Sequence, residues 1–333
     1  MRIAKWDNLK FVLIYFVVLG HFIGIFKCDS FFLKGLQFFI YTFHMPAFLF
    51  ISGLFSKRTI DERRYDKVFP YFFLYIFMKG LRFVVHFLIH GKTSSFSFWS
   101  ESGVPWFALT LLLCYLITIA VSHFPSSYVM IMAVCIGILA GYDCDLGDFL
   151  TGMRTLTFYP FFFAGYCVPI KKVTEFTEKK IVKVFSFGLL LAVLTGSFLF
   201  ETRVYNKLGF LKGKASYAAL HFERYGGIFR GTYYVIALAL ILAVIALTPS
   251  VNCFVTKWGS RTLQVFALHF SALRILQDGM NLKGIMKELT PNYYGYLIPL
   301  MAFILTSILS AGVFEPFFRW LMHPVKKGKI ERV

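Results

Sequence analysis

Long apolar stretches alternate with short polar segments along almost all of this 333-residue chain. About ten stretches contain roughly 15–24 residues each, the length that a helix needs to cross a bilayer. They are Leu9–Phe26, Leu36–Leu54, Phe69–His90, Pro105–Ser122, Tyr128–Tyr142, Gly152–Val168, Ile181–Phe200, Thr232–Leu247, Leu263–Gln277 and Tyr294–Phe318. No internal repeat interrupts the pattern. It predicts an all-α fold, a polytopic transmembrane helical bundle forming one domain over residues 1–333.

Composition agrees with a membrane protein. Hydrophobic residues make up 58% of the chain and charged residues 16%, against about 25% charged in soluble domains. The formal net charge is +18, but the lysines and arginines lie between the apolar stretches. We therefore expect them to face membrane lipid and an anionic co-substrate, and we expect no nucleic acid. We predict a retained first helix without signal cleavage, in a multi-pass protein of the plasma membrane.

Positive charge also predicts the orientation, because basic residues favour the cytoplasmic side of a membrane. If both termini are cytoplasmic, more of the lysines and arginines lie on the cytoplasmic side than on the outer side. The positions predicted inside are Arg2, Lys5, Lys10, Lys57, Arg58, Arg63, Arg64, Lys67, Lys171, Lys172, Lys179, Lys180, Lys183, Lys257, Arg261, Arg319, Lys326, Lys327, Lys329 and Arg332. The long segment Glu201–Gly231 would then lie outside. Its aromatic and charged residues fit a sugar-facing surface or, in the interpretation we prefer, an interfacial loop with aromatic anchors.

Ionisable residues inside apolar stretches are candidates for chemistry, because charge in hydrocarbon is costly. Lys10 and His21 lie eleven residues apart, so they share one helix face and are separated by about 16 Å along its axis. Ile14, Val17 and Gly24 complete that face. This face is the first predicted site element.

Two further histidines are expected at a similar depth. His44 precedes Met45 and Pro46, where the missing backbone donor predicts a broken helix. His44, His269 and His21 all fall near the middle of their apolar stretches, so the three could converge. Each could instead be an interhelical hydrogen bonder, and His44 could satisfy carbonyls freed by the break.

A basic segment follows the second apolar stretch. It contains Lys57, Arg58, Arg63, Arg64 and Lys67. These residues could bind phosphate, since arginine suits bidentate contacts with phosphate, or could act only as a topology signal. The acidic residues between them partly offset their charge.

Metal binding is not indicated. The six cysteines are scattered singly, without a CxxC motif or a His/Cys cluster. The stretch Asp143–Asp148 looks like the start of a calcium loop, but Arg154 stands where the bidentate Glu belongs. We interpret this stretch as a turn and expect no metal.

Several of these motifs together carry a family resemblance. A basic residue, ten intervening residues and a histidine occur here as Lys10 and His21, and residues 43–46 (FHMP) run into residues 50–53 (FISG). The chain thereby resembles the membrane-bound acyltransferase-3 family, within it the fucose 4-O-acetylase-like acetyltransferases. Weaker similarities occur at residues 104–107, which include Trp106, and at residues 259–269, which end at His269. Lys10 stands where many members have arginine, which weakens any bidentate contact there.

The resemblance implies transfer of an acyl group, usually acetyl, from cytoplasmic acetyl-CoA to a hydroxyl of a glycan or its lipid-linked precursor. His21 would be the general base or a covalent acyl carrier, with a carboxylate orienting its second nitrogen. Lys10, Asp7 and His44 complete the predicted catalytic group, although Asp7 is better placed to pair with Lys10 than to reach His21. The basic segment would bind the CoA phosphates, and Trp106 and His269 the acceptor. The oligomeric state is left open.

A transporter or flippase for a lipid-linked or anionic solute is the competing class. Such proteins also contain broken helices and intramembrane histidines. Inverted repeats and a mid-span acidic residue would support that class. Neither is visible in this sequence.

Overall fold

A computed structural model describes residues 4–26, 30–93, 97–101, 103–201, 205–291 and 293–323. Within these ranges the regular secondary structure is helical, apart from an isolated bridge between Ser100 and Phe149. The main helices are α1 (Ala4–Phe26), α2 (Phe31–Tyr41), α3 (His44–Leu54), α4 (Lys57–Asp61), α5 (Tyr65–Val68), α6 (Pro70–His90), α7 (Trp106–Val121), α8 (Ser126–Leu139), α9 (Gly152–Cys167), α10 (Ile170–Glu178), α11 (Lys180–Leu199), α13 (Leu208–Leu211), α14 (Gly226–Leu247), α15 (Phe254–Gly259), α16 (Thr262–Arg274), α17 (Leu282–Leu289), α18 (Tyr294–Leu309) and α19 (Glu315–Met322). The predicted all-α fold is confirmed.

Every predicted apolar stretch contains a helix, but the helices differ in length. Among the described residues, five helical segments are long and apolar enough to cross a membrane, or six if α18 and the segment Gly312–Met322, bent by 45°, are one span. By contrast α16 has 13 residues, and its length of about 20 Å falls short of a hydrocarbon core of about 30 Å. The count of about ten spans therefore stays a prediction.

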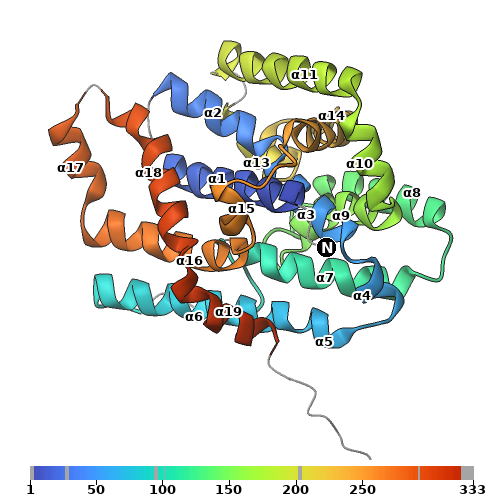
Figure 1. The fold of residues 1–333 in the computed structure, drawn as a ribbon, viewed down its shortest axis with the longest axis horizontal. Helices are drawn as coiled ribbons and strands as arrows, with labels where there is room; N and C mark the ends of the chain where they lie inside the picture. The colour runs from blue at the N-terminus through green and yellow to red at the C-terminus, as the bar shows by residue number, and fades with distance from the viewer. Residues whose placement is uncertain are drawn as a thin grey trace, which may run out of the picture.

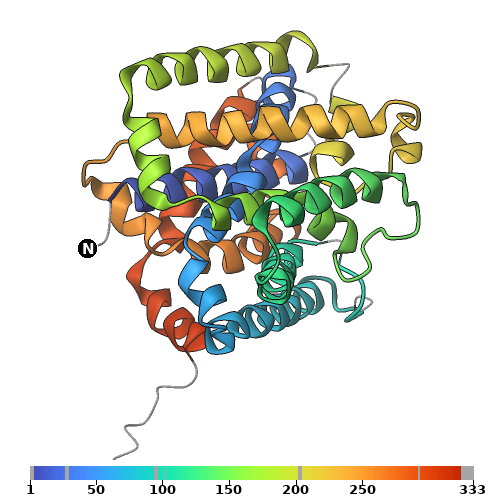
Figure 2. The same cartoon turned by 90° about the vertical axis from the view of Figure 1, so that its right-hand side faces the viewer.

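Helix α1 lies in the middle of the molecule, whereas α11 lies along one edge (Figures 1 and 2). In the most apolar part of α1, 67% of the residues are buried, against 11% in α11. The neighbours of α1 are α2, α3, α15, α16 and α18. An ionisable residue on α1 therefore faces protein or a cavity.

The start of α1 is anchored by buried polar contacts. The Lys5 ammonium lies 2.5 Å from a Glu178 carboxylate oxygen and is buried. Hydrogen bonds from Lys183 and Lys5 lower the pKa of Glu178 to about 2. On the other flank the Asn8 amide donates to the carbonyl oxygens of Pro249 and Val251. These contacts fix the register of α1 against α10 and the segment before α15.

The second apolar stretch is broken, as Pro46 predicts. α2 ends at Tyr41 and α3 begins at His44, so proline occupies the third position of a new helix, where its missing N–H costs little. His44 Nδ1 lies 2.8 Å from the Ile40 carbonyl oxygen. His44 thus satisfies a carbonyl at the break and is held in place by it.

Two glycines allow a close contact between α3 and α9. A Cβ atom on Gly53 would lie 1.9 Å from the Phe162 carbonyl oxygen, and one on Gly165 would lie 2.0 Å from that of Phe50. α3 and α9 therefore cross with their backbones touching. This contact fixes α9, which carries Arg154, relative to α3, which carries His44.

The predicted orientation can be tested by cysteine labelling. Ser216, in the segment predicted outside, is a poor reporter because it is buried beside Cys144. Glu223 is exposed. With the native cysteines replaced, Glu223→Cys should react with an impermeant maleimide on intact cells, and Lys171→Cys only after permeabilisation. The opposite pattern would invert the orientation. Arg2 and residues 326–332, which the charge count included, lie outside the described residues.

Candidate functional site

Two adjoining cavities lie along α1. The inner cavity, toward the start of α1, has a volume of about 150 Å³, and the central cavity a volume of about 360 Å³. Val17, Met45 and Phe266 line both. The two cavities therefore meet at these three side chains.

A third cavity continues from the central one. This outer cavity has a volume of about 420 Å³ and shares Gly103, Phe270 and Arg274 with the central cavity. Polar and charged residues of α6 and of the end of α16 line it. The three cavities therefore form a series in which the central cavity adjoins the inner one and the outer one.

The helix face predicted from the sequence lines this series. Lys10, Ile14 and Val17 border the inner cavity, and Val17, His21 and Gly24 border the central one. Lys10 and His21 therefore face connected cavities. A slender ligand arm could follow this face of α1.

The three histidines converge, as predicted. The His21 and His269 rings lie 5.2 Å apart between centroids, and His44 lines the central cavity together with His21. His269 Nδ1 lies 2.8 Å from the Phe266 carbonyl oxygen and 3.1 Å from that of Val265. Because a carbonyl only accepts hydrogen bonds, Nδ1 carries the proton and Nε2 keeps its lone pair.

His269 Nε2 is buried and has no hydrogen-bond partner among the described residues. His44 has the same tautomer, because its Nδ1 also faces a carbonyl oxygen. Two proton acceptors therefore lie beside His21. An unsatisfied buried acceptor is costly, so a ligand or a proton carried by His21 would stabilise this group.

No carboxylate orients His21 among the described residues; His269 lies beside it instead. Asp7 forms the predicted ion pair with Lys10, whose Nζ lies 2.8 Å from Asp7 Oδ1. These two residues lie at the inner end of α1. The predicted mid-membrane depth of His21 stays a prediction, but its place along α1 is now defined. Since α1 begins at Ala4 and ends at Phe26, His21 lies about 25 Å from the first residue and about 8 Å from the last.

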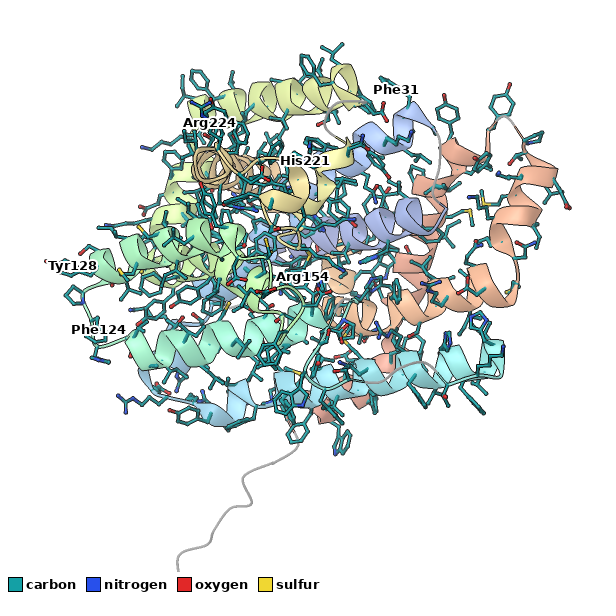
Figure 3. All side chains as sticks on the ribbon, turned by 180° about the vertical axis from the view of Figure 1, so that it is seen from behind. Phe31, Phe124, Tyr128, Arg154, His221 and Arg224 are labelled. Carbon is teal, nitrogen blue, oxygen red and sulfur yellow. The ribbon has the colours of Figure 1, made fainter. Side chains whose placement is uncertain are left out.

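Arg154 is the main residue that the sequence analysis did not assign to the site. It is buried and lines the central cavity, with its guanidinium carbon 5.0 Å from the centre of the Trp106 ring. Figure 3 shows it in the interior of the bundle, while Phe124 and Tyr128 project from the margin. The sequence feature that could have indicated Arg154 is the presence of an arginine near the start of the apolar stretch 152–168, because charge in such a stretch is costly.

The long segment predicted outside covers the central cavity. Five of its apolar side chains are buried, namely Leu208, Phe210, Leu211, Tyr217 and Leu220, whereas Tyr225, Ile228 and Phe229 are exposed. Lys212 and Lys214 line the cavity from the same segment. Loss of solvent around its side chain, together with the charges of Arg154 and Lys214, lowers the pKa of Lys212. The mouth of the cavity is therefore electropositive.

The basic segment lies outside the central cavity, near the inner one. Ser52 and Tyr71, which bracket the segment in sequence, both line the inner cavity. Three of its basic residues pair with nearby carboxylates: Lys57 with Asp61 at 3.4 Å, Arg58 with Glu62 at 2.9 Å and Arg64 with Asp66 at 3.5 Å. Lys67 instead contacts His323, distant in sequence, at 3.1 Å. Arg63 is exposed and has no such partner among the described residues.

The calcium-like stretch is a turn, as interpreted. The Asp143 carboxylate accepts hydrogen bonds from the backbone N–H groups of Asp145 and Leu146, each at 2.7 Å. Asp148 instead pairs with Lys214 at 3.2 Å and Arg154 at 3.6 Å. Across the described residues, no group of three His, Cys, Asp or Glu side chains could hold a metal ion.

Comparison with known proteins identifies the family of the chain. Residues 3–314 match the family model described as an acyltransferase domain, Acyl_transf_3. The chain therefore belongs to the acyltransferase-3 family and is a membrane protein with apolar helices.

A curated relative matches only in part. The nodulation protein NolL of Sinorhizobium fredii (strain NBRC 101917 / NGR234) is 28% identical over 131 residues, which cover 35% of this chain and 36% of that protein. No solved structure matches the chain.

Proposed function

We propose that this protein transfers an acetyl group from acetyl-CoA to a hydroxyl of a cell-envelope or extracellular glycan, or of its lipid-linked precursor. The observation that carries the proposal is the series of three cavities with His21, His44 and His269 at its middle. One substrate can approach His21 from each end. Family membership favours acyl transfer over transport through the same passage.

The inner cavity suits the donor. Its lining is mostly apolar, and it passes from Lys10 to Val17 beside the basic segment. Lys10 and His21 are separated by about 16 Å along α1, so a flexible arm entering at Lys10 would have to cover about that distance. Arg63 would contribute to binding the CoA phosphates at the entrance.

The central cavity suits the reaction. Acetyl-CoA supplies the thioester; His21 would take the proton of the acceptor hydroxyl as its oxygen bonds to the carbonyl carbon, and would return it to the sulfur as the carbon–sulfur bond breaks. His269, with its free Nε2, would position His21 and stabilise its protonated form. Arg154 would offset negative charge on the reacting carbonyl oxygen. A covalent acyl group on His21 would use the same geometry.

The function is tested with the purified full chain in sealed vesicles. Labelled acetyl-CoA is placed on one face and a glycan acceptor on the other, and free CoA and labelled glycan are measured. Release of CoA that depends on acceptor supports the proposal. Transport of intact acceptor without release of CoA would support the flippase alternative and overturn it.

The basic segment gives a separate prediction. Arg63→Ala should raise the KM for acetyl-CoA about tenfold with little change in kcat, because a charged hydrogen bond to phosphate contributes about 1.5–3 kcal/mol. Arg58→Ala is the matched control, since Arg58 already pairs with Glu62 and is largely exposed. Steady-state kinetics at saturating acceptor would measure both. Equal KM values for wild type and Arg63→Ala would reduce the segment to a topology signal.

A further inference from the structure

The outer cavity is built from charged groups on two helices. Arg82, His86 and His90 recur every four residues along α6 and so share one face. Arg274 and Asp278 face them from the end of α16 and the turn after it, joined by an ion pair of 2.8 Å. A volume of about 420 Å³ lies within the range of small-molecule sites, about 300–1,000 Å³.

Positive charge exceeds negative charge around this cavity. The buried Glu101 carboxylate forms ion pairs with two cations, Lys79 at 3.1 Å and Arg82 at 3.6 Å. The same arrangement occurs at the neighbouring central cavity, where Asp148 serves both Arg154 and Lys214. Each carboxylate leaves one positive charge in excess. Two adjoining cavities with this balance attract an anion and are unfavourable for a cation.

Two arginines stand where the outer and central cavities join. Arg82 crosses closely over Gly103, which lines both cavities: a Cβ atom on Gly103 would lie 2.1 Å from Arg82 Nη1. The Arg274 guanidinium carbon lies 5.3 Å from the centre of the Phe270 ring, and that ring centre lies 5.5 Å from that of His21. A single aromatic ring therefore separates Arg274 from the reactive histidine.

We propose that the outer cavity is the acceptor site and that Arg82 and Arg274 bind an anionic group of the acceptor, a sugar carboxylate or a phosphate. This inference rests on the proposed function. Arginine forms paired hydrogen bonds with either group. Binding at the junction would hold a neighbouring hydroxyl of the same acceptor beside His21. The charge on the acceptor would thus determine which glycans are modified.

Binding of three matched probes tests the proposal: a neutral hexose, the corresponding hexuronate and the corresponding hexose phosphate. Binding to the full chain in nanodiscs is measured by ligand-observed NMR. At least one anionic probe should bind tenfold or more tighter than the hexose, and added salt should reduce the difference. The tighter anion identifies whether the charge is a carboxylate or a phosphate. Equal binding of all three probes would overturn the proposal.

Variants locate the site. Arg274→Gln and Arg82→Gln should each lower anion affinity toward that of the hexose, and Arg82→Lys should retain part of it by keeping the charge beside Glu101. Arg224→Gln, at an exposed arginine outside the cavity lining, should leave the preference unchanged. A preference that survives unchanged in folded Arg274→Gln and Arg82→Gln variants would place the anion elsewhere. If the substitutions prevent folding, the comparison of probes on wild type still decides the matter.

Failure of this inference is distinguishable from failure of the proposed function. Release of CoA with a neutral acceptor as readily as with an anionic one would reject the anionic site and retain the acetyltransferase. Preferential anion binding without any release of CoA would retain the site and reject the acetyltransferase.

Discussion

Replacing His21 with alanine is expected to reduce acetyl transfer by about 10²–10⁴-fold, the usual loss when a general base is removed. His21 lines the central cavity at the point where routes from both ends meet, and no hydrogen bond to another described side chain occupies its ring nitrogens. The alanine variant should still fold and bind acetyl-CoA, because His21 makes few stabilising contacts. Single-turnover release of CoA and donor affinity are the two measurements.

His123 supplies the matched control, since it is exposed on the turn between α7 and α8. His123→Ala should retain full activity. His269→Ala should lose less activity than His21→Ala if His269 acts by positioning His21, and its pH–rate profile should shift because the neighbour of the base has changed. Retention of more than a few per cent of wild-type turnover in His21→Ala would remove His21 as the base.

The convergence of the histidines could be predicted because helical rise converts sequence position into depth. Once each apolar stretch is assigned to a helix, residues near the middle of different stretches must occupy one layer. The same arithmetic did not predict where α1 begins, because polar residues before Leu9 extend the helix to Ala4. Lys5 and Asn8 are buried and find partners on α10 and near α15, and a local hydropathy pattern contains no information about those partners.

Lateral neighbours could not be predicted in this way. Arg154, Lys212 and Arg274 belong to distant parts of the chain and meet only because of which helices pack together. The contact between Gly53 and Gly165 that positions α9 is a property of a pair of helices. Sharing of Glu101 between Lys79 and Arg82 is likewise a tertiary arrangement. Charge composition showed an excess of cations without showing where it would be concentrated.

The side of His21 on which each substrate lies is open to a direct test with two substitutions on one helix face. Val17 lines the junction of the inner and central cavities, and Gly24 lies one helical turn beyond His21, on the side away from Lys10. Val17→Trp should close the donor route and reduce kcat/KM for acetyl-CoA by tenfold or more. Gly24→Leu should instead raise the KM for the acceptor, because a Cβ atom there meets only the Gln37 amide, at 3.5 Å, and further atoms would enter the cavity.

The difference in kinetics between Val17→Trp and Gly24→Leu decides which substrate uses which route. Overpacking at Val17 costs about 1–3 kcal/mol, so thermal stability must be measured for both, and Val17→Ala provides a variant that leaves the junction open. Kinetics with each substrate varied in turn then show which route is affected. A donor KM that rises in Gly24→Leu and stays unchanged in Val17→Trp would reverse the assignment of the two routes. Equal loss for both substrates in both variants, with folding intact, would mean that donor and acceptor enter the central cavity from the same side.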